Sequence, residues 1–167
     1  MYEQLAMKFN KKEIVLLSFV IVAVLVRLLP HPPNVAPITA VALFAGTQFS
    51  KKHWAILMPL LAMLFTDLFL GFSLITPIVY LAFIGITSLG FVLKKMNLGS
   101  VLLSSLLFFV VTNLGVWLLH YPLTPTGFAS CFTFAIPFFG YSILGDLFFS
   151  AALLYGYRFA MLRLRLA

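Results

Sequence analysis

The chain has 167 residues, of which 63% are hydrophobic and only 9% are charged, and its formal net charge is +7. So few charged residues leave too little polar surface for a soluble globule, and the composition is typical of a membrane domain. The basic residues flank apolar stretches instead of alternating with aromatic residues along one face, which argues against nucleic-acid binding. We therefore expect a single all-α transmembrane domain over residues 1–167, embedded in the lipid bilayer, with no nucleic-acid partner.

Six apolar stretches predict six helices, since a helix needs about twenty residues to cross about 30 Å of hydrocarbon. The predicted helices cover approximately residues 13–29, 36–49, 53–72, 77–93, 98–119 and 137–157. Three prolines at positions 30, 32 and 33 end the first helix because they cannot continue it. The second helix is too short to cross unaided, and we expect an irregular stretch before it. Residues 127–135 are either an interfacial segment or an extension of the last helix.

Charge patterning predicts the topology. All but one of the 11 Lys and Arg residues fall in four clusters: Lys8, Lys11 and Lys12; Lys51 and Lys52; Lys94 and Lys95; and Arg158, Arg163 and Arg165. The connections between these clusters, at residues 30–37, 72–77 and 120–127, contain no Lys or Arg. By the positive-inside rule, this alternation predicts six crossings with both termini in the cytoplasm. We expect the protein in a bacterial inner membrane.

Two opposite charges fall inside the predicted helices, where a charge is costly unless it faces a partner or a cavity. Arg27 lies in the outer third of the first helix, and Asp67 lies in the outer third of the third. Their similar depth makes them candidates for a structural ion pair that holds the two helices together. They are also candidates for a ligand pocket, although a structural pair is the commoner arrangement, and both interpretations remain open.

Further polar residues converge on the same outer level from other helices. Asn113 and Trp117 lie near the outer end of the fifth helix, and Asp146 lies nearer the middle of the sixth. Asn34 precedes the short second helix, whose N-terminal amides attract anions or carbonyl groups. We predict that these groups bind a small solute in an outward-facing pocket, with substrate-binding residues Asn34, Asp67, Asn113, Trp117 and Asp146.

Each of these residues also has a structural interpretation. Asn113 is suited to bond a helix backbone, which is the usual role of a lone amide in a bundle. Trp117 lies where an aromatic belt would place it. Asp146 could bond Tyr141 or Asn113 instead of a ligand.

Catalysis and metal binding fit the sequence poorly. Two intramembrane aspartates are also found in intramembrane aspartyl proteases, but those use Gly-x-Gly-Asp, and residues 142–146 lack the first glycine. The three histidines are far apart in sequence, and the single cysteine, Cys131, excludes a cysteine cluster within one chain. Phosphate-binding loops and serine-nucleophile motifs are missing from the sequence. We expect no enzyme activity, no cofactor and no metal site.

Three stretches, at residues 27–46, 65–71 and 108–122, resemble sequences of a family of small, uncharacterised bacterial integral membrane proteins. The resemblance to this family extends over nearly the whole chain. That family is in turn similar to the substrate-binding S components of energy-coupling-factor vitamin transporters. This resemblance implies a six-helix bundle with an outward-facing substrate site. S components typically carry an Ala-x-x-x-Ala pattern on the first helix for docking, whereas here such spacing occurs on the second, as in Ala42 and Gly46.

The sequence therefore predicts a small-solute-binding membrane protein, the substrate-specific component of a transporter. Since no nucleotide-binding motif is present, ATP-driven transport would require separate ATPases and a coupling-factor transmembrane subunit as partners. The alternative is a non-transporting membrane subunit or assembly factor whose buried polar residues only hold helices together.

Overall fold

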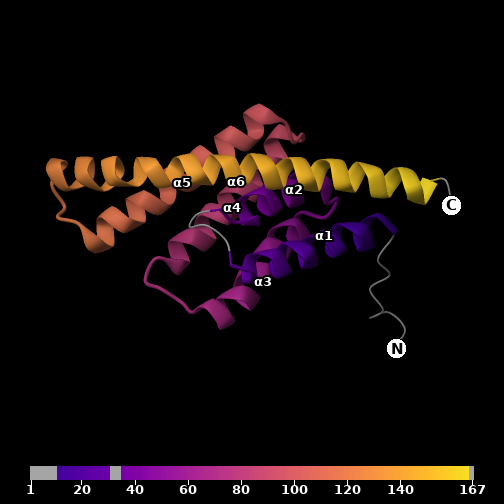
Figure 1. Cartoon of the computed structure of the whole chain (residues 1–167), viewed down its shortest axis with the longest axis horizontal. Coiled ribbons are helices and arrows are strands. Elements are labelled where there is room, and N and C mark those ends of the chain that lie inside the picture. Colours follow the sequence, from indigo (N-terminus) through magenta and orange to yellow (C-terminus); the bar gives the residue numbers. More distant parts are fainter. Residues whose placement is uncertain (1–10, 31–34, 166–167) are drawn as a thin grey trace.

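The computed structural model describes residues 11–30 and 35–165, and within these ranges it contains helices and no strand, as expected (Figure 1). The helices are α1 (Lys11–Leu28), α2 (Ile38–Gln48), α3 (Lys52–Leu70), α4 (Thr76–Leu93), α5 (Leu98–His120) and α6 (Pro125–Arg165). By length and composition, α3, α4, α5 and α6 are long and apolar enough to cross a membrane. Membrane crossing by α1 and α2 remains a prediction.

The last helix is one continuous element, so residues 127–135 extend it. It contains 41 residues with Pro137 in its interior. At 1.5 Å per residue it is about 60 Å long, roughly twice the thickness of the hydrocarbon core. Proline is tolerated within membrane helices because neighbouring helices and side chains satisfy the freed backbone groups. α6 runs along the whole molecule, and its first half forms a hairpin with α5 that extends beyond the other helices (Figure 1).

The short helix α2 is the centre of the bundle. It contacts all of the other helices. Every residue from Ile38 to Gly46 is buried. A helix that is apolar all round is suited to such a position, because no face of it needs to meet water. α2 therefore acts as a core element around which the longer helices pack.

Two glycines allow α2 to cross α4 at very short range. A Cβ atom added to Gly46 would lie 2.2 Å from the backbone oxygen of Thr87, and one added to Gly90 would lie 2.8 Å from the Gly46 Cα. Small residues at helix crossings permit such close contact and the van der Waals packing that comes with it. The small-residue spacing on the second helix thus serves packing inside the bundle.

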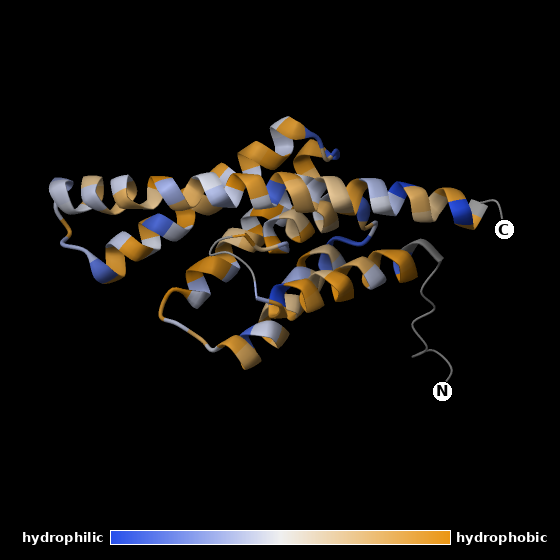
Figure 2. Ribbon diagram, viewed as in Figure 1, coloured by the Kyte–Doolittle hydropathy of each residue, from blue (hydrophilic) through white to orange (hydrophobic). Residues whose placement is uncertain are grey.

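The basic residues gather toward one end of the molecule. The start of α1, the connection before α3 with Lys51, the turn between α4 and α5 with Lys94 and Lys95, and the end of α6 lie in its right-hand half (Figures 1 and 2). We call this the basic end. The connections at residues 71–75 and 121–124 lie at the opposite end.

We predict that the basic end faces the cytoplasm. Reporter fusions placed after Leu93 and after the C-terminus should both report a cytoplasmic location. A fusion near Thr124 should report the outside. Opposite locations for the two ends of the chain would mean an odd number of crossings and would contradict the predicted topology.

Replacing Gly46 with alanine should destabilise the fold, because its Cβ would clash with backbone that cannot rotate away. Overpacking of this kind typically costs about 1–3 kcal/mol. The matched control is Gly140→Ala in α6, where an added Cβ meets nothing within 4 Å. Thermal unfolding in detergent should show a lower midpoint for Gly46→Ala only. Equal midpoints for the two variants would show that the crossing tolerates a side chain.

Candidate functional site

The two opposite charges predicted at similar depth lie in contact. Arg27 Nη2 of α1 is 2.8 Å from Asp67 Oδ1 of α3. The side chains are 15% and 6% exposed, so the pair is largely shielded. At such depth an ion pair needs further hydrogen bonds to offset the loss of hydration.

Neighbouring hydroxyl groups supply those hydrogen bonds. Tyr80 of α4 donates its phenolic hydrogen to Asp67 Oδ2 at 2.8 Å, so both carboxylate oxygens are bonded. The second nitrogen of the Arg27 fork, Nη1, donates to the Thr66 hydroxyl. Thr66 can accept this bond because its own hydrogen is directed to a backbone oxygen of the preceding turn, that of Ala62 or Met63. The network joins α1, α3 and α4.

Asp146 forms a second buried polar group. It is 3% exposed, and its Oδ2 lies 2.6 Å from the Ser105 hydroxyl of α5. Thr39 of α2 is another hydrogen-bonding partner. The bonding partners are therefore hydroxyl groups of α5 and α2, and not the Tyr141 or Asn113 considered from the sequence. In the described part of the chain, the ion pair is that of Arg27 with Asp67, so Asp146 is bonded to hydroxyl groups and has no basic side chain within ion-pair distance.

Three adjoining cavities lie beside these groups. We name them after one lining residue each: the Asn113 cavity of about 260 Å³, the Asp146 cavity of about 120 Å³ and the Asp67 cavity of about 180 Å³. Val79 lines all three, and Arg27 lines the latter two. Taken together, they reach the size of an ordinary small-molecule site, about 300–1,000 Å³.

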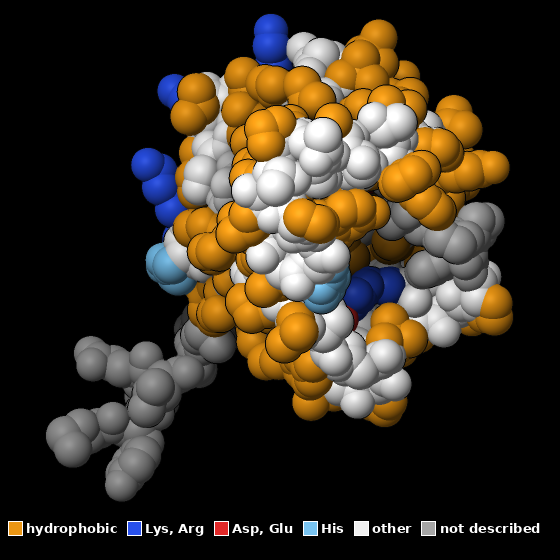
Figure 3. Space-filling view, turned by 90° about the vertical axis from the view of Figure 1, so that its left-hand side faces the viewer, with side chains coloured by type: hydrophobic (Ala, Val, Ile, Leu, Met, Phe, Trp, Pro, Cys, Tyr) orange, Lys and Arg blue, Asp and Glu red, His pale blue; other side chains and the backbone are white. Residues whose placement is uncertain are grey.

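The hollow is visible from the end opposite the basic end. Figure 3 looks onto that end and shows a basic side chain set back from the surrounding surface, with part of an acidic side chain beside it. Arg27 and Asp67 line the Asp67 cavity together with Gly71 and Ser73, which belong to the connection at this end of the molecule. The polar groups are thus reached from this end of the molecule.

Aromatic side chains form much of the wall. Phe108, Phe109, Phe138 and Phe139 line the Asn113 cavity. The rings of Phe109 and Phe139 stack with their centroids 4.4 Å apart. Asn113 lines the same cavity, while its Nδ2 donates to the Phe109 carbonyl of its own helix at 2.7 Å. Its side-chain oxygen is an acceptor that a ligand could use.

The other two predicted site residues are placed differently. Trp117 is not among the lining residues of the three cavities. Its indole Nε1 donates to the Pro122 carbonyl at 3.1 Å, and its ring packs edge-on against Phe128. It steadies the connection between α5 and α6, and ligand contact by Trp117 stays a prediction. Asn34 lies outside the described residues.

Two residues that line the Asp146 cavity, Ser142 and Met63, were not among the candidates from the sequence. A hydroxyl or thioether in an apolar helix carries little positional signal, because serine and threonine also satisfy their own helix, as Ser142 does by donating to the Phe138 carbonyl. Within residues 11–30 and 35–165, no group of three or more His, Cys, Asp or Glu side chains could hold a metal ion.

Comparison with known proteins gives one match. A model of the family of unknown function DUF6580 matches residues 7–166. No curated protein matches the chain. No solved structure matches it either, so a relationship to S components stays a hypothesis from the sequence. The match covers nearly the whole sequence, and the chain therefore belongs to the family of unknown function DUF6580.

Proposed function

We propose that this protein binds a small solute in the adjoining Asn113, Asp146 and Asp67 cavities and helps it across a bacterial inner membrane. The observation that carries this proposal is the joint placement of Arg27, Asp67 and Asp146 beside cavities that open at the end opposite the basic end. A recess with mainly apolar walls and a few convergent polar groups is the usual form of a ligand site. By the positive-inside rule the basic end would face the cytoplasm, so the recess at the opposite end would face the outside.

The lining favours a ligand with two unlike parts. The polar part would lie near Arg27 and Asp146, where a charged donor and a carboxyl group line one cavity. The apolar, preferably flat part would lie against the phenylalanines of the Asn113 cavity. Such a molecule would offer hydrogen-bonding partners to the buried polar groups and an apolar surface to the phenylalanine rings.

In this proposal the chain is the substrate-specific component of a transporter. Energy from ATP would come from separate ATPases through a coupling-factor transmembrane subunit, as the resemblance to S components implies. Docking of that subunit would have to use a helix other than α2, because its small residues Ala42 and Gly46 are buried against α4. The outward face of α1, with Ile21 and Leu25 exposed, is an available surface.

The second candidate function is a non-transporting membrane subunit or assembly factor. It is favoured by one observation: both oxygens of Asp67 and both terminal nitrogens of Arg27 have protein partners. A network satisfied in this way can hold α1, α3 and α4 together without any ligand.

Blocking the pocket should separate the two functions. Ser142 lines both the Asn113 and the Asp146 cavities, so Ser142→Phe would fill the space where they meet. Native mass spectrometry of the purified wild-type protein should reveal a co-purified small molecule, and the Ser142→Phe protein should retain at least about tenfold less of it. The matched control is Ser18→Phe, at an exposed position of α1.

Two results would contradict the proposed function. One is a wild-type protein that carries no small ligand in any preparation and gains none when small-molecule extracts are added. The other is a ligand that both phenylalanine variants lose equally, because that ligand would not lie in these cavities. Thermal unfolding of each variant checks that the fold is retained.

The ion pair gives a separate test of its structural role. Removing one partner leaves a buried charge alone, which typically costs about 3–5 kcal/mol. Arg27→Met and Asp67→Leu should therefore each lower folded yield strongly, while the double variant should recover much of it. The measurement is the midpoint of thermal unfolding in a double-mutant cycle. If the double variant shows simply the sum of the two single losses in stability, the residues do not act as a pair. A folded double variant that keeps its ligand would favour a purely structural role.

A further inference from the structure

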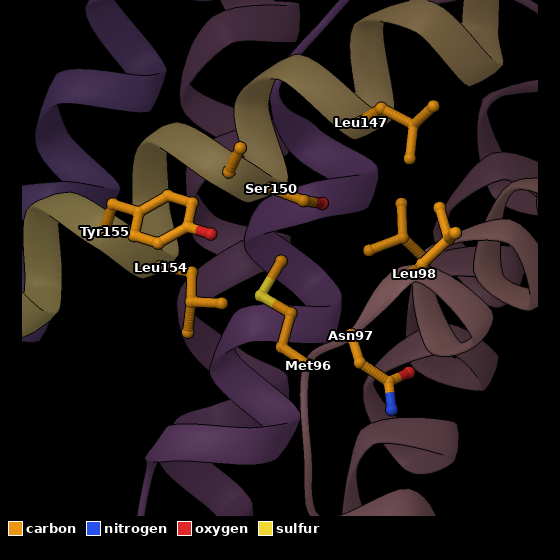
Figure 4. Close-up of a pocket in the computed structure, with 9 residues that line it drawn as sticks. Met96, Asn97, Leu98, Leu147, Ser150, Leu154 and Tyr155 are labelled. Atoms are coloured by element: carbon orange, nitrogen blue, oxygen red, sulfur yellow. The ribbon is translucent and has the colours of Figure 1, made fainter.

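A fourth cavity lies between α5 and α6, nearer the basic end than the three cavities described above. Its volume is about 350 Å³, and most of its lining is aliphatic, including Leu98 and Val101 of α5 and Leu147 and Leu154 of α6. The side chains face one another across the space between the two helices (Figure 4). We call this space the α5–α6 groove. It shares no lining residue with the Asn113, Asp146 or Asp67 cavities.

A buried hydroxyl in the groove lacks a partner. Ser150 is 4% exposed, and among the buried polar side-chain atoms that the structure describes, its oxygen is the one without a hydrogen bond. Figure 4 shows this hydroxyl directed toward the space between the two helices. An unpaired buried hydroxyl costs about 1–3 kcal/mol, so an acceptor on a bound molecule would stabilise it. The groove is therefore lined by a hydrogen-bond donor that has no acceptor within the described residues.

Positive charge borders the same groove. Lys94 and Lys95 directly precede the lining residues Met96 and Asn97, and both lysines are exposed. Tyr155, also in the lining, adds a second hydroxyl. Aliphatic walls, hydroxyl groups and two lysines directly before the lining residues match a molecule with an acyl chain, ester carbonyl acceptors and an anionic headgroup.

We propose that the α5–α6 groove is a binding site for an anionic phospholipid such as phosphatidylglycerol. One acyl chain lies between α5 and α6, an ester carbonyl accepts the Ser150 hydrogen, and the phosphate lies at Lys94 and Lys95. Basic pockets between transmembrane helices on the cytoplasmic side commonly bind anionic headgroups. The site is independent of the proposed function, since the solute cavities play no part in it.

The test is a lipid titration of the delipidated full-length protein by native mass spectrometry. Phosphatidylglycerol and phosphatidylcholine with identical acyl chains are compared. Two lysines near the surface predict roughly thirtyfold tighter binding of the anionic lipid. Lys94→Gln combined with Lys95→Gln should remove most of that difference and leave phosphatidylcholine binding unchanged.

Matched variants separate the site from general surface charge. The control pair Lys51→Gln with Lys52→Gln removes the same charge at the basic end, where Lys52 lies over the Phe91 ring and neither lysine lines the groove. This pair should retain the preference for phosphatidylglycerol. Ser150→Ala should weaken the binding of both lipids several-fold, because both carry the ester carbonyl that would accept the Ser150 hydrogen.

Filling the groove tests where the acyl chain lies. Ala151→Phe should abolish the preferential binding of phosphatidylglycerol, and Leu98→Trp, on the opposite wall, supplies the same block if the first variant does not fold. Equal affinity of the wild-type protein for the two lipids would overturn the proposal. So would equal losses for the two lysine pairs, or full retention of phosphatidylglycerol binding by folded groove-filling variants.

Discussion

Gly46 and Gly90 lie against each other where α2 crosses α4, and neither position has room for a Cβ atom. The rest of the bundle depends on this contact, because α2 touches every other helix and has no exposed face between Ile38 and Gly46. A helix of this length cannot cross a membrane alone. Buried among longer helices, it can instead set their spacing and bring Thr39 beside Asp146 of α6. The close crossing thus also positions one wall of the candidate site.

The polar residues of the bundle are tied to different pairs of helices. Arg27, Asp67 and Tyr80 join α1, α3 and α4, and Asp146 joins α6 to α5 through Ser105. The first network balances its charges internally, whereas Asp146 has hydroxyl partners only. An acid at such depth marks a functional position by default. The two groups meet at the Asp146 cavity, so a ligand there would contact Arg27 of the first network on one side and Asp146 on the other.

Much of the fold could be predicted because it follows from hydrophobic length and from prolines. α3, α4 and α5 begin and end within about two residues of the predicted segments. The start of α6 was harder to predict, because a proline such as Pro137 often stands at the first turn of a helix. In the structure the helix continues through Pro137 and begins at Pro125. The nearness of Arg27 and Asp67 was foreseeable from their opposite charge and similar depth. The partners of Asp146 were not, because a serine and a threonine on apolar helices carry no signal of where they point. The outward position of Trp117 depends on the α5–α6 hairpin extending past the other helices, which segment lengths alone do not reveal.

The two ends of the molecule offer opposite chemistry to the two sides of a membrane. At one end Arg27 is bonded to Asp67 and to the Thr66 hydroxyl, and Tyr80 donates to the same carboxylate, so the charge of the arginine is shielded. At the basic end Lys51, Lys52, Lys94 and Lys95 are exposed. Lys94 adopts a left-handed conformation with φ of 55°, which ends α4 and begins the turn leading to α5. Exposed lysines remain free to meet lipid phosphate, whereas a shielded arginine can respond only to a molecule small enough to enter its cavity. This difference in accessibility, more than the number of charges, is the reason why we propose solute recognition at one end and contact with the bilayer surface at the other.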